Sequence, residues 1–144
     1  MKFLKIITHP ILLVTSFSFV VISGDKFSWF YIIIVLLSLI QLKIHAIAAI
    51  FGLILLFAGL GARLSNRVKN IFFISGATLL MLSLLIFFES GKSYNEWNTF
   101  SDRTSQISMG VFIIFWIIFF IKHLVGLAKD LNKKKNNSMG LQRI

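Results

Sequence analysis

Long apolar runs separated by short polar segments occupy most of the chain. An apolar run of about 18 residues or more is typical of a helix that crosses a bilayer, because about 20 helical residues span its hydrocarbon core of about 30 Å. The pattern predicts an all-α, polytopic bundle of transmembrane helices in one domain, residues 1–128. The expected spans cover residues 6–23, 27–42, 44–62, 71–88 and 107–127, and residues 129–144 are expected to form a basic cytoplasmic tail.

The number of spans depends on the apolar run of residues 27–62, which only Gln41, Lys43 and His45 interrupt. As a single helix this run would be about 54 Å long, which exceeds the hydrocarbon core even when the helix is tilted. A turn at the interruption divides the run in two and gives five spans, the topology we favour. No glycine or proline marks that turn, so four spans with a long or broken second helix remain the alternative.

Composition agrees with a membrane environment. Hydrophobic residues make up 57% of the chain and charged residues 14%, whereas about a quarter of the residues in a soluble domain are charged. A soluble globule of this composition would expose large apolar patches. The sequence therefore excludes an ordinary water-soluble domain.

The net charge of +10 does not indicate a nucleic-acid partner, because the basic residues flank the apolar runs instead of forming a basic face. Such residues anchor helices at lipid headgroups and favour the cytoplasmic side. We therefore expect a multi-pass membrane protein with a cytoplasmic C-terminus and the bilayer as a partner. The abundance of Ile, Phe, Lys and Asn resembles a bacterial coding bias, so the expected membrane is a bacterial plasma (inner) membrane. The expected headgroup anchors are Arg63, Arg67, Lys69, Lys133, Lys134 and Lys135.

The amino-terminal charges conflict with the five-span topology. Two spans in the run of residues 27–62 put the amino terminus outside, where Lys2 and Lys5 violate the positive-inside rule. One span in that run puts these lysines inside. The length of the run and the charge of the terminus thus favour different topologies.

Lys43 and His45 form the most interesting polar pair, because an ionisable side chain within lipid often marks a proton or substrate path. With four spans Lys43 and His45 would lie near the middle of the membrane, and with five spans they belong to an interfacial turn. His9, which precedes the helix-initiating Pro10 near the start of the first span, is a further candidate for a polar interfacial site. His9, His45 and His123 have no second ligand one turn away, and the chain has no cysteine. We expect no metal, no cofactor and no catalytic residue.

A stripe of small residues follows the interruption and falls on one helix face: Ala48, Gly52, Gly59 and Ala62. Small side chains let a second helix approach closely in lipid. Packing within the chain is the simplest interpretation, and contact with another subunit is the alternative.

The leading functional hypothesis is a non-enzymatic accessory or structural subunit of a larger membrane assembly, bound to a membrane-protein partner or to copies of itself. The first alternative is a small oligomeric channel or transporter that uses Lys43 and His45. The second is a lipid-modifying enzyme in which His9, His45 and Glu89 gather near one headgroup region.

Overall fold

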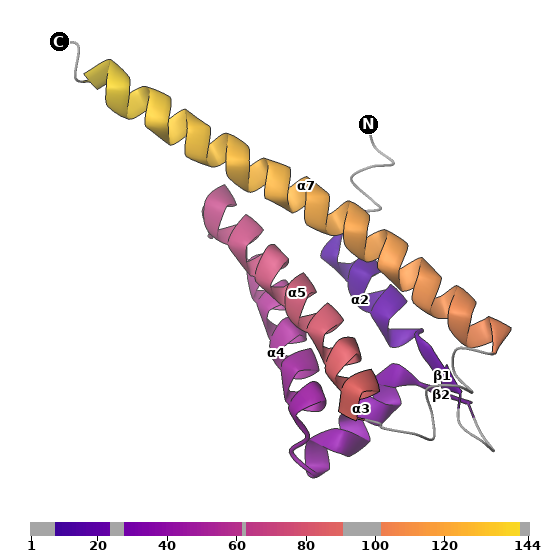
Figure 1. Cartoon of the computed structure of the whole chain (residues 1–144). Coiled ribbons are helices and arrows are strands. Elements are labelled where there is room, and N and C mark those ends of the chain that lie inside the picture. The colour runs from indigo at the N-terminus through magenta and orange to yellow at the C-terminus, as the bar shows by residue number, and fades with distance from the viewer. Residues whose placement is uncertain (1–7, 24–27, 62, 91–101, 142–144) are drawn as a thin grey trace.

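The computed structural model describes residues 8–23, 28–61, 63–90 and 102–141, most of which are helical (Figure 1). In chain order the elements are α2 (Pro10–Ser18), β1 (Val21–Ser23), β2 (Ser28–Phe30), α3 (Tyr31–Ile40), α4 (Ile44–Gly59), α5 (Asn66–Ser90) and α7 (Arg103–Leu141). The expected all-helical character is confirmed apart from one small hairpin. The favoured five-span bundle is not, because only α5 and α7 are individually long and apolar enough to cross a membrane.

Helix α2 covers only the middle of the first predicted span. Pro10 occupies its first turn, and His9 caps it by accepting a hydrogen bond from the Ile11 N–H at its Nδ1 (3.3 Å). The helix ends at Ser18, after three hydroxyl side chains that hydrogen-bond back to carbonyls one turn earlier. Such bonds compete with the helical ladder, and the β-branched residues that follow favour extended structure. The expectation of helix up to residue 23 was therefore wrong.

Strands β1 and β2 form an antiparallel pair in which Val21, Ile22 and Ser23 face Phe30, Trp29 and Ser28. The strand β2 corrects the start of the second predicted span, which was expected to be helical from residue 27. Helix α3 then runs for only 10 residues and ends where the turn was predicted.

The turn between α3 and α4 is a Schellman motif built without glycine. The Leu42 N–H donates to the Leu39 carbonyl (3.0 Å), and the Lys43 N–H donates to the Ser38 carbonyl (3.1 Å). Leu42 takes the left-handed conformation at φ 52°, a position that glycine usually fills. The motif bends α3 away from α4 by 113°, so the two helices form at most one broken span.

Contacts between distant segments show which ends of the helices lie together. Helix α4 runs antiparallel to α5, since His45 contacts Phe87 and Gly59 lies against Phe73. Helix α5 runs antiparallel to α7, since Asn70 hydrogen-bonds His123. We call the end of the bundle at which Asn70 meets His123 the tail end. It contains the start of α2, the segment between α4 and α5, and the later half of α7 (Figure 1).

The opposite region, which we call the hairpin end, contains β1 and β2, helix α3, the end of α5 and the start of α7 (Figure 1). Thr8 hydrogen-bonds Lys122, and Ser23 hydrogen-bonds Ser105. Residues 8–23 therefore run antiparallel to α7. These contacts span 17 positions of α7 (122 minus 105), or about 26 Å. Helix α2 and strand β1 together therefore cover nearly the thickness of a hydrocarbon core.

Glycines allow α4 and α5 to pack with their backbones close together. A Cβ atom added to Gly76 would lie 2.8 Å from the Gly52 carbonyl oxygen, and one added to Gly59 would lie 2.6 Å from the Phe73 ring. Two members of the predicted small-residue face, Gly52 and Gly59, thus contact a helix of the same chain. Ala48 is half-buried, and Ala62 lies outside the described residues.

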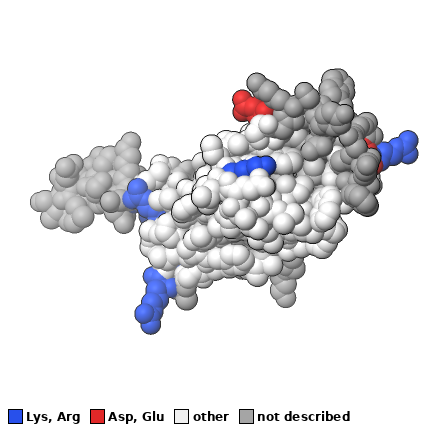
Figure 2. Space-filling view, turned by 90° about the horizontal axis from the view of Figure 1, so that it is seen from below, with Lys and Arg blue, Asp and Glu red and all other residues white. Residues whose placement is uncertain are grey.

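Large aromatic side chains fill the interior, while apolar side chains also cover the outer helix faces. Phe17 packs edge-on against Tyr31 and Phe112, and all three are fully buried. Outward-facing residues such as Phe51 and Ile114 keep more than half of their surface exposed. Figure 2 shows few charged side chains on an otherwise uncharged face. An apolar exterior of this kind fits a lipid environment and not water.

Candidate functional site

The predicted pair of Lys43 and His45 does not form a shared site. Lys43 is exposed at the bend, and its side chain does not cap the helix that follows. The His45 side chain is buried, with its ring edge-on to Phe87 at a centroid distance of 5.3 Å. Its Nε2 has no hydrogen-bond partner among the described residues. One side chain therefore faces outward while its neighbour is enclosed by the bundle.

The structure also separates the residues of the lipid-enzyme alternative. His9 lies at the tail end beside Thr8, whereas His45 and Glu89 lie at the hairpin end. Asn70 and Phe87, which lie near opposite ends of α5, are 17 positions apart, which corresponds to about 26 Å. Within the described part of the chain, no group of three metal-binding side chains occurs.

A polar cluster joins the hairpin to the start of α7. The Ser23 hydroxyl donates to Asp102 Oδ2 (2.7 Å) and lies 2.8 Å from the Ser105 hydroxyl and 3.2 Å from the Ser28 hydroxyl. The Ser105 N–H also donates to Asp102 Oδ2 (3.1 Å), so this carboxylate caps the first turn of α7.

These donors determine the chemistry of Asp102. The hydrogen bond from Ser23, followed by those from Ser105, lowers the carboxyl pKa below its ordinary value. Hydrogen bonds to the charged form stabilise the carboxylate and make it a poorer base. The cluster therefore suits a structural role, holding β1 against α7.

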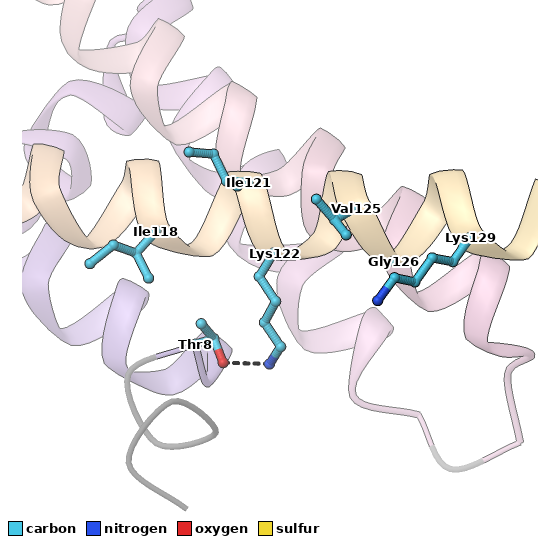
Figure 3. Close-up of a pocket in the computed structure, with 7 residues that line it drawn as sticks. All are labelled: Thr8, Ile118, Ile121, Lys122, Val125, Gly126 and Lys129. Carbon is cyan, nitrogen blue, oxygen red and sulfur yellow. Dashed lines mark hydrogen bonds between the residues drawn. The ribbon is translucent and has the colours of Figure 1, made fainter. Parts of the chain in front are cut away.

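The second region with polar side chains is an open groove at the tail end, between Thr8, two positions before α2, and the outer face of α7 (Figure 3). Its volume is about 570 Å³. The side chains that line it are mainly apolar, with lysines at positions 122 and 129: Thr8, Ile118, Ile121, Lys122, Val125 and Lys129. The Lys122 Nζ donates a hydrogen bond to the buried Thr8 hydroxyl.

Helical spacing explains why these residues share one face of α7. Lys122 and Lys129 are seven positions apart, nearly two full turns, and Ile118 and Val125 have the same spacing. Figure 3 shows the Lys129 side chain running back along the helix toward Lys122. The groove thus presents two ammonium groups above an aliphatic wall.

A close contact between α5 and α7 forms the back of this region. The Asn70 Oδ1 lies 2.8 Å from the His123 Nδ1, and the His123 ring packs against Phe73 and Phe119. A Cβ atom added to Gly126 would lie 2.9 Å from the Asn70 Nδ2. His123 is buried by these contacts, which fix the position of α7 beside the groove.

Lys122 and His123 stand toward the cytoplasmic end of the last apolar run, where interfacial anchoring alone would explain them, and no sequence pattern singles out Thr8. The one sequence feature that could have indicated the groove is the position of Lys122, which lies inside the last apolar run and not after it. The predicted anchors Arg63, Arg67 and Lys133 are exposed, and Lys69 is partly buried. The side chains of Lys134 and Lys135 lie outside the described residues.

No family model, curated protein or solved structure matches this chain.

Proposed function

We propose that the chain is a multi-pass protein of a bacterial inner membrane with its tail end in the cytoplasm. Arg63 and Arg67 lie between α4 and the first turn of α5, and Lys129 and Lys133 lie on the later half of α7. All four belong to the tail end, where the positive-inside rule favours the cytoplasm. Thr8 also lies there, and Lys2 and Lys5 precede it in the sequence. This orientation removes the charge conflict that five spans create.

The same arrangement supports four crossings in place of five. The crossings are residues 8–23, α4, α5 and α7, all of which run between the tail end and the hairpin end. Helix α3 has 10 residues, about 15 Å, and its 113° bend from α4 directs it across the bundle. We place α3 at the outer headgroup level, where its polar end and Lys43 reach water.

The function that this geometry supports best is that of a non-enzymatic accessory subunit with a rigid cytoplasmic arm. The observation that carries it is the length of α7, which continues as one helix for 39 residues. That length corresponds to about 58 Å, of which the hydrocarbon core accounts for about 30 Å. The remainder extends beyond the other helices at the tail end (Figure 1). A stiff basic helix held by a membrane bundle is suited to docking a partner.

The buried polar groups favour this role over transport. Ser23 and Ser105 lie at the hairpin end, while Thr8 and His123 lie at the tail end. Between these layers, apolar side chains such as Phe112 fill the interior. A transporter needs a continuous polar route, and the described side chains of one chain do not form one.

The test is co-purification in a mild detergent of the parent chain and two variants of Asn132, an exposed residue of α7 that follows Lys129 by three positions. Asn132→Pro breaks the arm while preserving every charge, because proline removes a helical hydrogen bond and clashes with the preceding turn. Asn132→Ala is the matched control. We expect a partner at a fixed ratio with the parent and with Asn132→Ala, and its loss with Asn132→Pro.

Two results would contradict this proposal. One is a solitary, monodisperse parent chain from mildly solubilised native membranes. The other is retention of the partner by Asn132→Pro at the parental ratio. Specific ion or solute flux through reconstituted parent chain, reduced in Lys43→Ala, would instead support the transport alternative.

A further inference from the structure

The groove beside Thr8 combines positive charge with an apolar wall, a combination that matches an amphiphilic anion. We propose that it binds one anionic glycerophospholipid of the cytoplasmic leaflet, with the phosphate near Lys122 and Lys129 and part of an acyl chain along Ile118, Ile121 and Val125. The proposal requires the membrane orientation inferred above but does not depend on the accessory-subunit function.

Charge complementarity identifies the headgroup. The two charged side chains among the described lining residues are both lysines, about 10.5 Å apart along the helix axis. Lysine binds phosphate as a point charge, and basic residues near a membrane surface attract anionic lipids. A zwitterionic headgroup would place its own cation beside these ammonium groups. The groove should therefore prefer a headgroup with a net negative charge.

The wall of the groove identifies the rest of the ligand. Ile118, Ile121 and Val125 are 37%, 54% and 47% exposed, although each is a large apolar side chain. A volume of about 570 Å³ is in the range of pockets that hold an organic molecule and exceeds the needs of a phosphate ion. An acyl chain would cover these side chains, whereas a free phosphate would leave them exposed.

The position of the groove along α7 matches the depth of a lipid headgroup. Its wall belongs to the end of the apolar run of residues 107–127, and Lys129 begins the basic tail. Thr8 orients the Lys122 ammonium across the groove through the hydrogen bond seen in Figure 3. A side chain that is already ordered loses less conformational entropy when a ligand binds. The groove therefore presents a preorganised cation where an anionic headgroup lies.

The test is native mass spectrometry of the full chain in detergent, titrated with phosphatidylglycerol or phosphatidylcholine of identical acyl chains. We expect one saturable phosphatidylglycerol site and binding of phosphatidylcholine that is about tenfold weaker or more. Lys129→Gln should weaken phosphatidylglycerol binding about fivefold, the effect of one surface lysine. Lys133→Gln is the matched control, because it removes the same charge from the same helix outside the groove and should leave binding nearly unchanged.

Soluble glycerol phosphate serves as a competitor that carries the headgroup chemistry without acyl chains, and it should not displace the lipid at equal concentration. Thermal unfolding without added lipid verifies that both variants fold. The proposal is overturned by equal binding of the two lipids, by equal weakening in the two lysine variants, or by effective competition from glycerol phosphate. A lipid-free dimer that excludes phosphatidylglycerol would overturn it as well, because a second chain would then occupy the groove.

Discussion

Substitution of Gly76 by alanine tests the close packing of α4 against α5. The new Cβ atom would lie 2.8 Å from the Gly52 carbonyl oxygen, 2.8 Å from the Leu56 Cγ and 3.1 Å from the Leu56 backbone nitrogen. Favourable contacts between carbon atoms have separations of about 3.5 to 4.0 Å. The helices would have to move apart by roughly 0.7 Å, since two of the three obstructing atoms belong to the backbone.

The expected cost follows from two opposing effects. Overpacking a well-packed interior costs about 1 to 3 kcal/mol. Alanine is a better helix former than glycine by about 1 kcal/mol, which offsets part of that cost. Gly110→Ala gives the same propensity gain without the crowding, because a Cβ atom there has no neighbour within 4 Å among the residues that the structure describes. The free energies of unfolding of the two variants should therefore differ by about 1 to 3 kcal/mol.

The assay is reversible unfolding in mixed micelles of a mild detergent and dodecyl sulfate, followed by near-ultraviolet circular dichroism. Gly76→Ala should unfold at a lower dodecyl sulfate fraction than Gly110→Ala. Equal midpoints would refute the reasoning, because α4 and α5 could not then approach as closely as their glycines indicate.

Three further substitutions test other parts of the fold. Tyr31→Phe removes the hydroxyl that donates to the Ser83 carbonyl (3.0 Å) and lies 2.8 Å from the Ser83 hydroxyl, and it should cost about 1 kcal/mol of unfolding free energy in the same micelles. Because Ser83→Ala keeps the Ser83 carbonyl, a cost unchanged in that background would show that the two hydroxyls do not interact. Leu42→Gly should stabilise the chain by about 1 kcal/mol, because glycine adopts a positive φ without the steric penalty of leucine; a loss of stability would contradict the Schellman turn. The pKa of Asp102 is lower in the folded state than its ordinary 3.8, so its stabilising effect is present above that pH and is lost as the pH falls from 3.8 through the folded-state value. The unfolding temperature should fall more steeply with decreasing pH for the parent than for Asp102→Asn. Parallel plots of unfolding temperature against pH for the two chains would exclude the proposed cap.

Hydrophobic patterning located the long helices because length and apolarity are local properties of the sequence. The predicted spans of residues 71–88 and 107–127 lie within α5 and α7. The predicted turn is present at residues 41–43, but His45, which was expected in it, belongs to the first turn of α4. The sharpness of that turn was not predictable, because it depends on Leu42 adopting a conformation that glycine usually supplies.

Two other features depend on contacts between distant segments. The helix expected through residue 23 gives way to a strand whose Val21 N–H and Ser23 hydroxyl bond to Ser108 and Ser105, more than 80 positions away. The tail-end groove likewise needs Thr8 beside Lys122. No periodicity within a single run encodes such pairings, so the sequence alone identified charged anchors but not a shared groove.

The most direct test of the account is the side of the membrane on which His9 lies. Single cysteines replacing His9, Ser28, Lys43, Asn66 and Asn132 can be labelled in intact cells with a membrane-impermeant maleimide, because the chain has no cysteine of its own. Four crossings predict that positions 28 and 43 react from outside, and that positions 9, 66 and 132 react only after the membrane is opened. Labelling of position 9 from outside, together with position 43, would restore the five-span topology and contradict the four-crossing bundle.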